Sequence, residues 1–242
     1  MTESVYKRIK NQFERVKLRV QSAAQSAGRD PDEIRLMVVT KAHSVNIVKA
    51  VVASGARILG ENYVEEAIPK INAIDNKDVE WHMIGHVQSR KARQVCDHFS
   101  WVHSLDRRKI ARRLNDFAGQ KNMKMPVLLE CNISGEESKF GYPVWKPEQW
   151  PEFVDEVAFI LELDNLEVKG LMTMPPWDTD PEASRPYFQY LRRLRAFLCQ
   201  KYPEEGWKEL SMGMSNDFEV AIQEGATIIR IGTAILGSRV NS

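Results

Sequence analysis

Lys41 is the residue whose position could support covalent chemistry. It follows the run Leu36–Thr40, whose four leading apolar residues are typical of a strand buried on both faces of a parallel sheet. Burying an ammonium group is costly, so a partly buried lysine there can lose its proton near neutral pH. An unprotonated lysine is a nucleophile toward carbonyl compounds. The alternative is that Lys41 only extends into solvent from the end of the strand.

Small polar residues lie near the ends of the last two expected strands. One loop reads Ser211-Met212-Gly213-Met214-Ser215, and the other contains Gly232-Thr233. In many β/α barrels phosphate binds at the loops after strands seven and eight. Glycine and serine let backbone amides approach an anion, although both are also common in ordinary turns. Together the two loops favour a phosphate site.

Arg230 interrupts the otherwise aliphatic strand expected over 227–231. An arginine in a buried strand should have a partner. That partner could be a glutamate or aspartate of the barrel, in a structural ion pair. Arg230 could instead face a ligand that lies between the phosphate loops and Lys41.

A strand-end lysine, two phosphate loops and an inward arginine match the groups of pyridoxal 5'-phosphate. Its aldehyde would meet Lys41, its phosphate would meet the loops, and Arg230 would lie near the pyridine nitrogen. An arginine cannot protonate that nitrogen and would keep the ring neutral. A neutral ring is a weaker electron sink, which argues against transaminase-like chemistry.

The elements that would position these residues alternate regularly between strand and helix. The expected strands are 36–40, 57–59, 80–84, 101–103, 127–131, 166–171, 209–212 and 227–231. The expected helices between them are 46–54, 63–74, 89–97, 107–118, 151–162, 181–202 and 216–224. Pro69 must end, start or kink its helix. Eight strands alternating with helices predict the α/β class and a single (β/α)₈ TIM barrel.

An additional N-terminal helix precedes the barrel. Its apolar residues recur every three to four positions, at Val5, Ile9, Phe13, Val16, Val20 and Ala24. Gly28 is a plausible residue to end it. We expect one domain over 1–242, with this helix in 1–28 covering the outside or one end of a barrel in 36–240.

The composition narrows the possible classes of protein. The chain has 242 residues, 28% of them charged, with a net charge of +1, so neither disorder nor a general attraction to nucleic acid is indicated. Cys96, Cys131 and Cys199 lie far apart, which favours reduced thiols and a cytoplasmic location. The first residues do not resemble a signal peptide, and no apolar stretch is long enough to cross a bilayer.

Two other patterns are less informative. The basic clusters 107–109, 112–113 and 192–195 lie on expected helices without interleaved aromatic residues, so we interpret them as solvated faces. His82 and His86 lie on a strand and its loop. The sequence places no acidic partner near them, so we interpret them as residues of a polar pocket or a turn and not as zinc ligands. We therefore expect no metal site.

The sequence resembles the pyridoxal phosphate homeostasis protein family over nearly its whole length. The matching stretches are Val39–Lys41, Gly60–Val64, Trp81–Gly85 with Gln88, Asn132–Lys139 with Gly141, Gly170–Met172, Leu210–Ser215 and Arg230–Thr233. Each stretch is modest alone, but their order and spacing are highly specific.

This resemblance implies a barrel like the N-terminal domain of alanine racemase, holding pyridoxal 5'-phosphate as an internal aldimine on Lys41. The residues that it places around the cofactor are Asn62, Ser211, Arg230, Gly232 and Thr233. It also implies a role in intracellular vitamin B6 homeostasis without established catalysis. PLP-dependent apoenzymes are candidate acceptors of the cofactor, and we expect a monomer or a weak dimer.

The sequence departs from the family pattern at three places. Phe140 stands where a small residue is usual, Arg90 stands where asparagine is usual, and Ala42-His43-Ser44 differs from the commoner sequence after the lysine. These departures affect loop contacts and the entrance of the expected site.

Two enzymatic alternatives stay open at this point. An amino-acid racemase would use the same cofactor but needs a proton donor on each face of its substrate. In related racemases the second donor comes from a domain that this sequence lacks. A barrel aldolase would use Lys41 for a Schiff base with a sugar phosphate, but nothing else in the sequence places a base near it.

Overall fold

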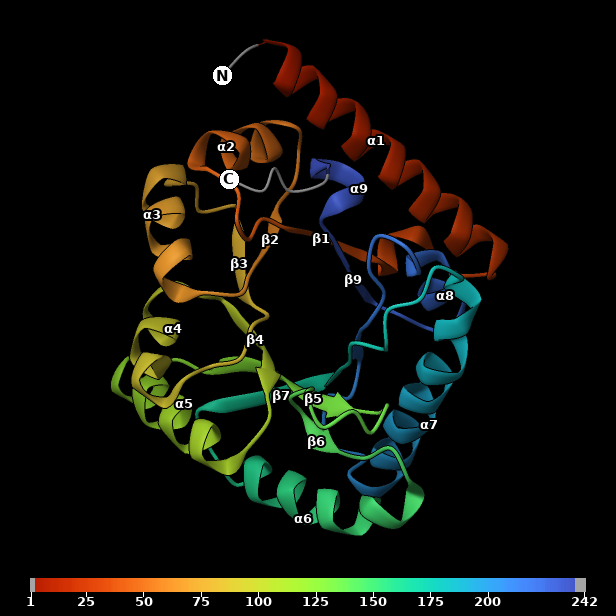
Figure 1. The fold of residues 1–242 in the computed structure, drawn as a ribbon. Helices are drawn as coiled ribbons and strands as arrows, with labels where there is room; N and C mark the ends of the chain where they lie inside the picture. Colours follow the sequence, from red (N-terminus) through yellow and green to blue (C-terminus); the bar gives the residue numbers. More distant parts are fainter. Residues whose placement is uncertain (1–2, 238–242) are drawn as a thin grey trace.

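The computed structural model describes residues 3–237 as a closed barrel of eight parallel strands. The strands pair in the order β1-β2-β3-β4-β5-β7-β8-β9, and β9 pairs with β1 to close the ring. Figure 1 shows the helices surrounding these strands. The predicted (β/α)₈ fold is therefore confirmed. The expected domain limits reach residues 1–2 and 238–242, which lie outside the described residues.

The barrel strands agree closely with the expected ones. They are β1 (Arg35–Val39), β2 (Ile58–Glu61), β3 (Glu80–Met83), β4 (Trp101–Leu105), β5 (Met125–Asn132), β7 (Leu166–Met172), β8 (Glu209–Ser211) and β9 (Ile228–Ile231). The larger helices are α1 (Glu3–Ser26), α2 (Val45–Ala53), α3 (Val64–Ile74), α4 (Ala92–His98), α5 (Arg108–Gln120), α6 (Trp150–Leu161), α7 (Arg185–Lys201) and α8 (Phe218–Gln223). α3 continues through Pro69 rather than ending there.

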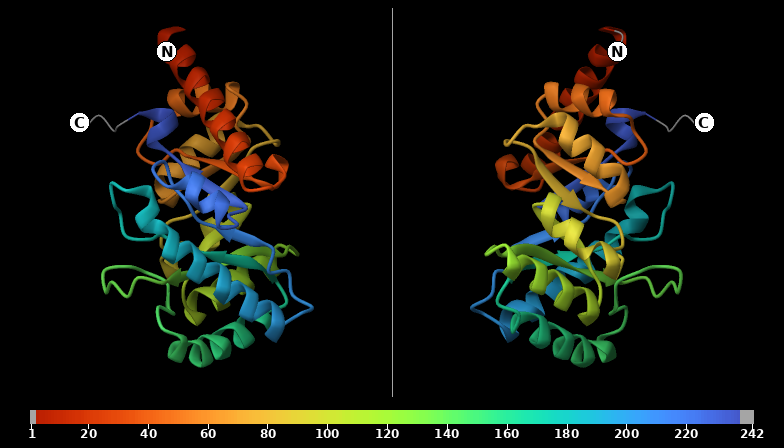
Figure 2. Two further views of the ribbon diagram at one scale, coloured as in Figure 1. Left: turned by 90° about the vertical axis from the view of Figure 1, so that its right-hand side faces the viewer. Right: turned by 90° about the vertical axis from the view of Figure 1, so that its left-hand side faces the viewer.

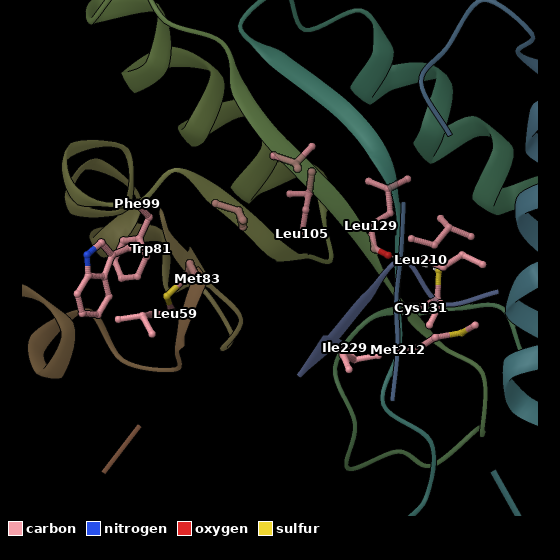
Figure 3. Close-up of a cluster of buried hydrophobic side chains, with 14 of the residues drawn as sticks. Leu59, Trp81, Met83, Phe99, Leu105, Leu129, Cys131, Leu210, Met212 and Ile229 are labelled. Atoms are coloured by element: carbon pink, nitrogen blue, oxygen red, sulfur yellow. Dashed lines mark hydrogen bonds between the residues drawn. The ribbon is translucent and has the colours of Figure 1, made fainter. Parts of the chain in front are cut away.

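Alternation along each strand separates two apolar regions. Ile229 and Ile231 belong to the large core between strands and helices, part of which is drawn in Figure 3, whereas Ile228 belongs to a smaller cluster with Met37. Side chains two residues apart in a strand lie on the same face. Arg230 therefore shares the face of Ile228, and β1 presents Met37 and then Val39 on the face of the smaller cluster.

α1 covers the outside of the barrel, one of the two expected positions. It packs against α2, α8 and α9 (Thr233–Leu236), as the views in Figure 2 also show. The helix ends as the sequence predicts, because Gly28 has a positive φ of 66° and the amide of Arg29 donates to the carbonyl of Ala24 at 2.9 Å.

Apart from short 3₁₀ helices, two elements were not expected from the sequence. β6 (Tyr142–Pro143) is a two-residue strand that pairs in parallel with the end of β5, outside the ring. α9 is a single helical turn that begins directly after Gly232. Both elements are too short to produce a hydrophobic period, so no sequence pattern marks them.

The cysteines and the helices agree with two simpler expectations. All three cysteines are free, with Cys96 and Cys131 buried and Cys199 exposed. Within residues 3–237, none of the helices combines the length and the apolar character that a membrane span requires.

Candidate functional site

A pocket of about 300 Å³ opens at the carboxyl ends of the barrel strands. Lys41 reaches it from the end of β1 and Asn62 from the end of β2. Arg230 of β9, followed by Gly232 and Thr233, completes the lining from the other side of β1. Five of the six predicted site residues, from distant parts of the sequence, therefore surround one cavity at the end of the barrel where active sites occur.

The backbone on both sides of Lys41 is held by α3. The carbonyl of Thr40 accepts a hydrogen bond of 2.9 Å from Lys70 Nζ, and the amide of Ala42 donates to Glu66 Oε2 at 3.0 Å. Ala42 has a positive φ of 62°, a conformation that costs energy for any residue except glycine. These contacts fix the direction in which the chain leaves β1, and with it the root of the Lys41 side chain.

Glu61 and Lys70 form a buried ion pair beneath this turn. Glu61 Oε1 accepts from Lys70 Nζ at 2.8 Å and from Thr40 Oγ1 at 2.6 Å, while Glu61 Oε2 has no hydrogen-bond partner. Burial raises the pKa of Glu61, and the hydrogen bonds from Lys70 and Thr40 oppose that rise. Such a pair is expensive to bury, and here it joins the ends of β1 and β2 to α3.

Arg230 is buried and held by main-chain and hydroxyl oxygens. Its Nη1 donates to the carbonyl and to the hydroxyl of Ser211, both at 2.7 Å, and its Nη2 donates to the carbonyl of Thr173 at 2.7 Å. Among the described residues no carboxylate forms an ion pair with it, so the barrel ion pair considered from the sequence is not found. Burial lowers the pKa of Arg230 to about 10, so the group stays cationic at neutral pH.

Ser211 is the predicted site residue that does not line this pocket. It is completely buried beneath it, at the end of β8. Its hydroxyl lies 3.0 Å from His103 Nδ1, and His103 Nε2 lies 2.9 Å from His82 Nδ1. His82 Nε2 in turn lies 3.0 Å from Glu80 Oε2. A polar chain therefore runs through the barrel from Arg230 to Glu80, and it is buried except at the half-exposed Glu80.

The two ends of this chain determine the direction of its hydrogen bonds. Burial lowers the pKa of His82 to about 4 and the pKa of His103 well below its usual value, so both rings are neutral and each carries one N–H. His82 donates from Nε2 to the Glu80 carboxylate, so its Nδ1 accepts from His103 Nε2. His103 Nδ1 then accepts the Ser211 hydroxyl proton, which leaves the Ser211 oxygen to accept from Arg230.

The histidines therefore have acidic partners that sequence reasoning missed. His82 contacts Glu80, and His86 Nδ1 lies 2.9 Å from Asp106 Oδ2. Their polar roles agree with the expectation. In the part of the chain that the structure describes, no group of three histidine, cysteine or acidic side chains is placed to hold a metal ion.

Glu130 is a further buried charge that sequence reasoning missed. Glu130 interrupts the otherwise apolar strand expected over 127–131, just as Arg230 interrupts the strand expected over 227–231. The same signal, a charged residue within an aliphatic strand, could have identified it. Glu130 is only 4% exposed and lies near the carboxyl end of β5.

Comparison with known proteins identifies relatives along almost the whole chain. The family described as alanine racemase, N-terminal domain, matches residues 12–240. The pyridoxal phosphate homeostasis protein of Aquifex aeolicus is 41% identical over 225 residues, covering 93% of this chain and 96% of the relative. The Escherichia coli K12 protein of the same name is 37% identical over 234 residues, covering 96% and 97%.

Solved structures have the same fold. PipY of Synechococcus elongatus, with PLP bound, is 32% identical with a TM-score of 0.77, covering 90% of this chain and all of that chain. A protein described as unknown, from Bifidobacterium adolescentis, is 31% identical with a TM-score of 0.87, covering 97% of each chain. Alanine racemase of Clostridium difficile is 15% identical with a TM-score of 0.68, and this chain covers 57% of it, a likeness of fold alone.

The extent of these matches agrees with the motifs around Lys41 and Arg230. The chain belongs to the pyridoxal phosphate homeostasis protein family, whose barrel is that of the alanine racemase N-terminal domain.

Proposed function

We propose that this protein binds pyridoxal 5'-phosphate on Lys41 and takes part in intracellular PLP homeostasis, without being an enzyme. The observation that carries the proposal is that Lys41 lines one pocket together with Arg230, Gly232 and Thr233. The bound PLP in the structure of PipY, a relative of 32% identity, supports it.

The residues of the pocket fit the three kinds of group in this cofactor. When bound, pyridoxal 5'-phosphate supplies an aldehyde that condenses reversibly with a primary amine. Lys41 provides the amine, and the small residues Ser215, Gly232 and Thr233 provide room and polar groups for a phosphate. Arg230 would provide a fixed cation near the ring nitrogen. Its low acidity means that it cannot hand a proton to that nitrogen.

In this proposal Ser211 acts through Arg230 and not by direct contact. Ser211 supplies two of the acceptors that hold the guanidinium, and it is itself ordered by His103. This assignment keeps Ser211 in the cofactor site while explaining why it lies below the pocket lining.

The lack of catalysis is part of the proposal. Racemisation requires a proton donor on each side of the substrate carbon, and this proposal assigns one such group, Lys41. PLP-dependent apoenzymes as acceptors, a cytoplasmic location and a monomeric or weakly dimeric state remain predictions of the same proposal.

The direct test is the visible absorption spectrum of the protein as purified, before cofactor is added. The proposal predicts a band from cofactor joined to Lys41, absent in Lys41→Ala and retained in Lys49→Ala, an exposed lysine on α2. An identical band in Lys41→Ala would refute the assignment. Turnover of amino-acid enantiomers well above that of free cofactor would refute the non-catalytic part.

A further inference from the structure

A second pocket, of about 380 Å³, adjoins the first. The two share Asn62, Ile84 and Met174 in their linings, so these side chains form the boundary between them. None of the six predicted site residues except Asn62 lines the second pocket, which leaves its purpose to be explained.

Glu130 lines this second pocket and has an unusual environment. Glu130 is 96% buried, yet its side chain makes no hydrogen bond and no ion pair with the described residues. Burial raises the pKa of Glu130 to about 7, with a contribution from Asp106, while Arg230 and Arg107 oppose the rise. Buried carboxyl groups are normally paired, so this group is expected to find its partner in whatever fills the pocket.

Two cations line the same pocket. Arg90 donates from Nε to Gln88 Oε1 at 3.0 Å, which uses one of the five N–H donors of its guanidinium. Lys91 forms an ion pair with Glu65, which also lines the pocket. The pocket therefore presents a buried acid, the exposed guanidinium of Arg90 and the Lys91–Glu65 ion pair to one volume.

An apolar surface completes the lining. Phe140, which is 55% exposed, stacks on the ring of His86 with the ring centroids 3.9 Å apart, and Met83 and Met174 add further apolar atoms. The second pocket therefore combines charged groups with an apolar surface.

We propose that the second pocket binds a free α-amino acid with an apolar side chain. The ammonium group lies at Glu130, the carboxylate lies at Arg90 and Lys91, and the side chain lies against Phe140 and Met174. A simple anion would leave the ionised form of Glu130 without a partner, and a simple amine would leave the exposed Arg90 unused. A zwitterion carries a group for each of them.

This inference deepens the proposed function and rests on it for its purpose, because the amino acid would wait beside the pocket of Lys41. The binding itself does not depend on the cofactor. Amino-acid binding and cofactor binding can therefore be tested separately. Full-length Lys41→Ala protein lacks the amine proposed to hold the cofactor, so leucine cannot act by displacing it.

The test is calorimetric titration of L-leucine into wild-type and Lys41→Ala protein, compared with 4-methylpentanoate and 3-methylbutylamine. Each analogue lacks one of the two charges, so each should bind at least about tenfold more weakly than leucine. Glu130→Gln and Arg90→Gln should both weaken leucine binding by about tenfold or more. Glu152→Gln, at an exposed position on α6, should change nothing.

Proton release separates a charge contact from a merely structural role. At pH 7 Glu130 is partly protonated, so an arriving ammonium should expel that proton. The heat of leucine binding should then differ between buffers of different ionisation enthalpy, and this difference should vanish in Glu130→Gln. Circular dichroism melting would verify that both variants are folded.

Several results would overturn the inference. The inference fails if titration of leucine into Lys41→Ala gives no heat of binding at millimolar concentrations. It also fails if 4-methylpentanoate binds as tightly as leucine. An unchanged affinity for leucine in folded Glu130→Gln and Arg90→Gln would also overturn it. If only cofactor-loaded protein responded to leucine, the amino acid would be acting at Lys41. A missing cofactor band would defeat the proposed function and leave this binding result standing.

Discussion

Arg230 Nη1 and the hydroxyl oxygen of Ser211 lie 2.7 Å apart, and this hydrogen bond closes one end of a buried chain through the barrel. The other end is the carboxylate of Glu80, which Arg35 contacts at 2.8 Å. Since a cation donates at one end and an anion accepts at the other, every proton between them has one position. The chain therefore orders the guanidinium that lines the pocket of Lys41.

His103→Leu removes the middle of this chain. The His82 ring nitrogen and the Ser211 hydroxyl would both lose a buried partner, so we expect a loss of about 1–3 kcal/mol in the free energy of unfolding. Urea denaturation measures this loss. His98→Leu, at a partly exposed position on α4, is the matched control and should cost less. Equal stability of His103→Leu and wild type would show that the chain is not energetically coupled.

Glu130→Gln should change how stability depends on pH. The pKa of Glu130 is raised in the folded protein, so the ionised carboxyl penalises the folded state, fully so only above pH 7. Relative to wild type, the variant should gain stability as pH rises from about 4.5 to 7, by at most about 3 kcal/mol, and the gain should then level off. Urea denaturation at several pH values measures it. A stability difference that is independent of pH would contradict the assignment.

Lys70→Met should strongly destabilise the protein. It leaves Glu61 buried without its counter-charge, and breaking such a pair typically costs about 3–5 kcal/mol. The double variant Lys70→Met/Glu61→Gln should recover part of this loss, because no buried charge remains. Denaturant unfolding of both variants measures the two effects. A double variant less stable than Lys70→Met would mean that the pair contributes little through its charge.

Ala42→Gly should stabilise the turn that follows β1. The φ of 62° at Ala42 is strained for alanine but not for glycine, so we expect a gain of about 0.5–1 kcal/mol. Ala53→Gly, near the end of α2, should instead destabilise by up to about 1 kcal/mol. Thermal melting compares the two. A loss of stability in Ala42→Gly would show that the conformation is not strained.

The fold was predictable because each barrel strand is a short apolar run bounded by turn residues, and because the order of elements alone implies closure. Lys41 and Arg230 were predictable for a related reason, since a charge at the end of or within an aliphatic strand is conspicuous. Glu130 carries the same signal as Arg230 but has no neighbouring motif to draw attention to it.

Other features of the site depend on distances that no local pattern records. His82 and His103 are 21 residues apart, and His103 and Ser211 are 108 residues apart. Only the closed ring of strands brings them into contact inside the barrel. The placement of Ser211 below the pocket follows from the face of β8 on which it lies, and β8 is too short to show its alternation in the sequence.

The central claim is that Lys41 is the amine that holds the cofactor. Reduction of the purified, cofactor-loaded protein with borohydride, followed by proteolysis and mass spectrometry, tests it most directly. We predict that the mass of the reduced cofactor is found on the peptide that contains Lys41 and on no other lysine in stoichiometric amount. A modification at Lys70 or Lys139 with Lys41 unmodified would contradict the account.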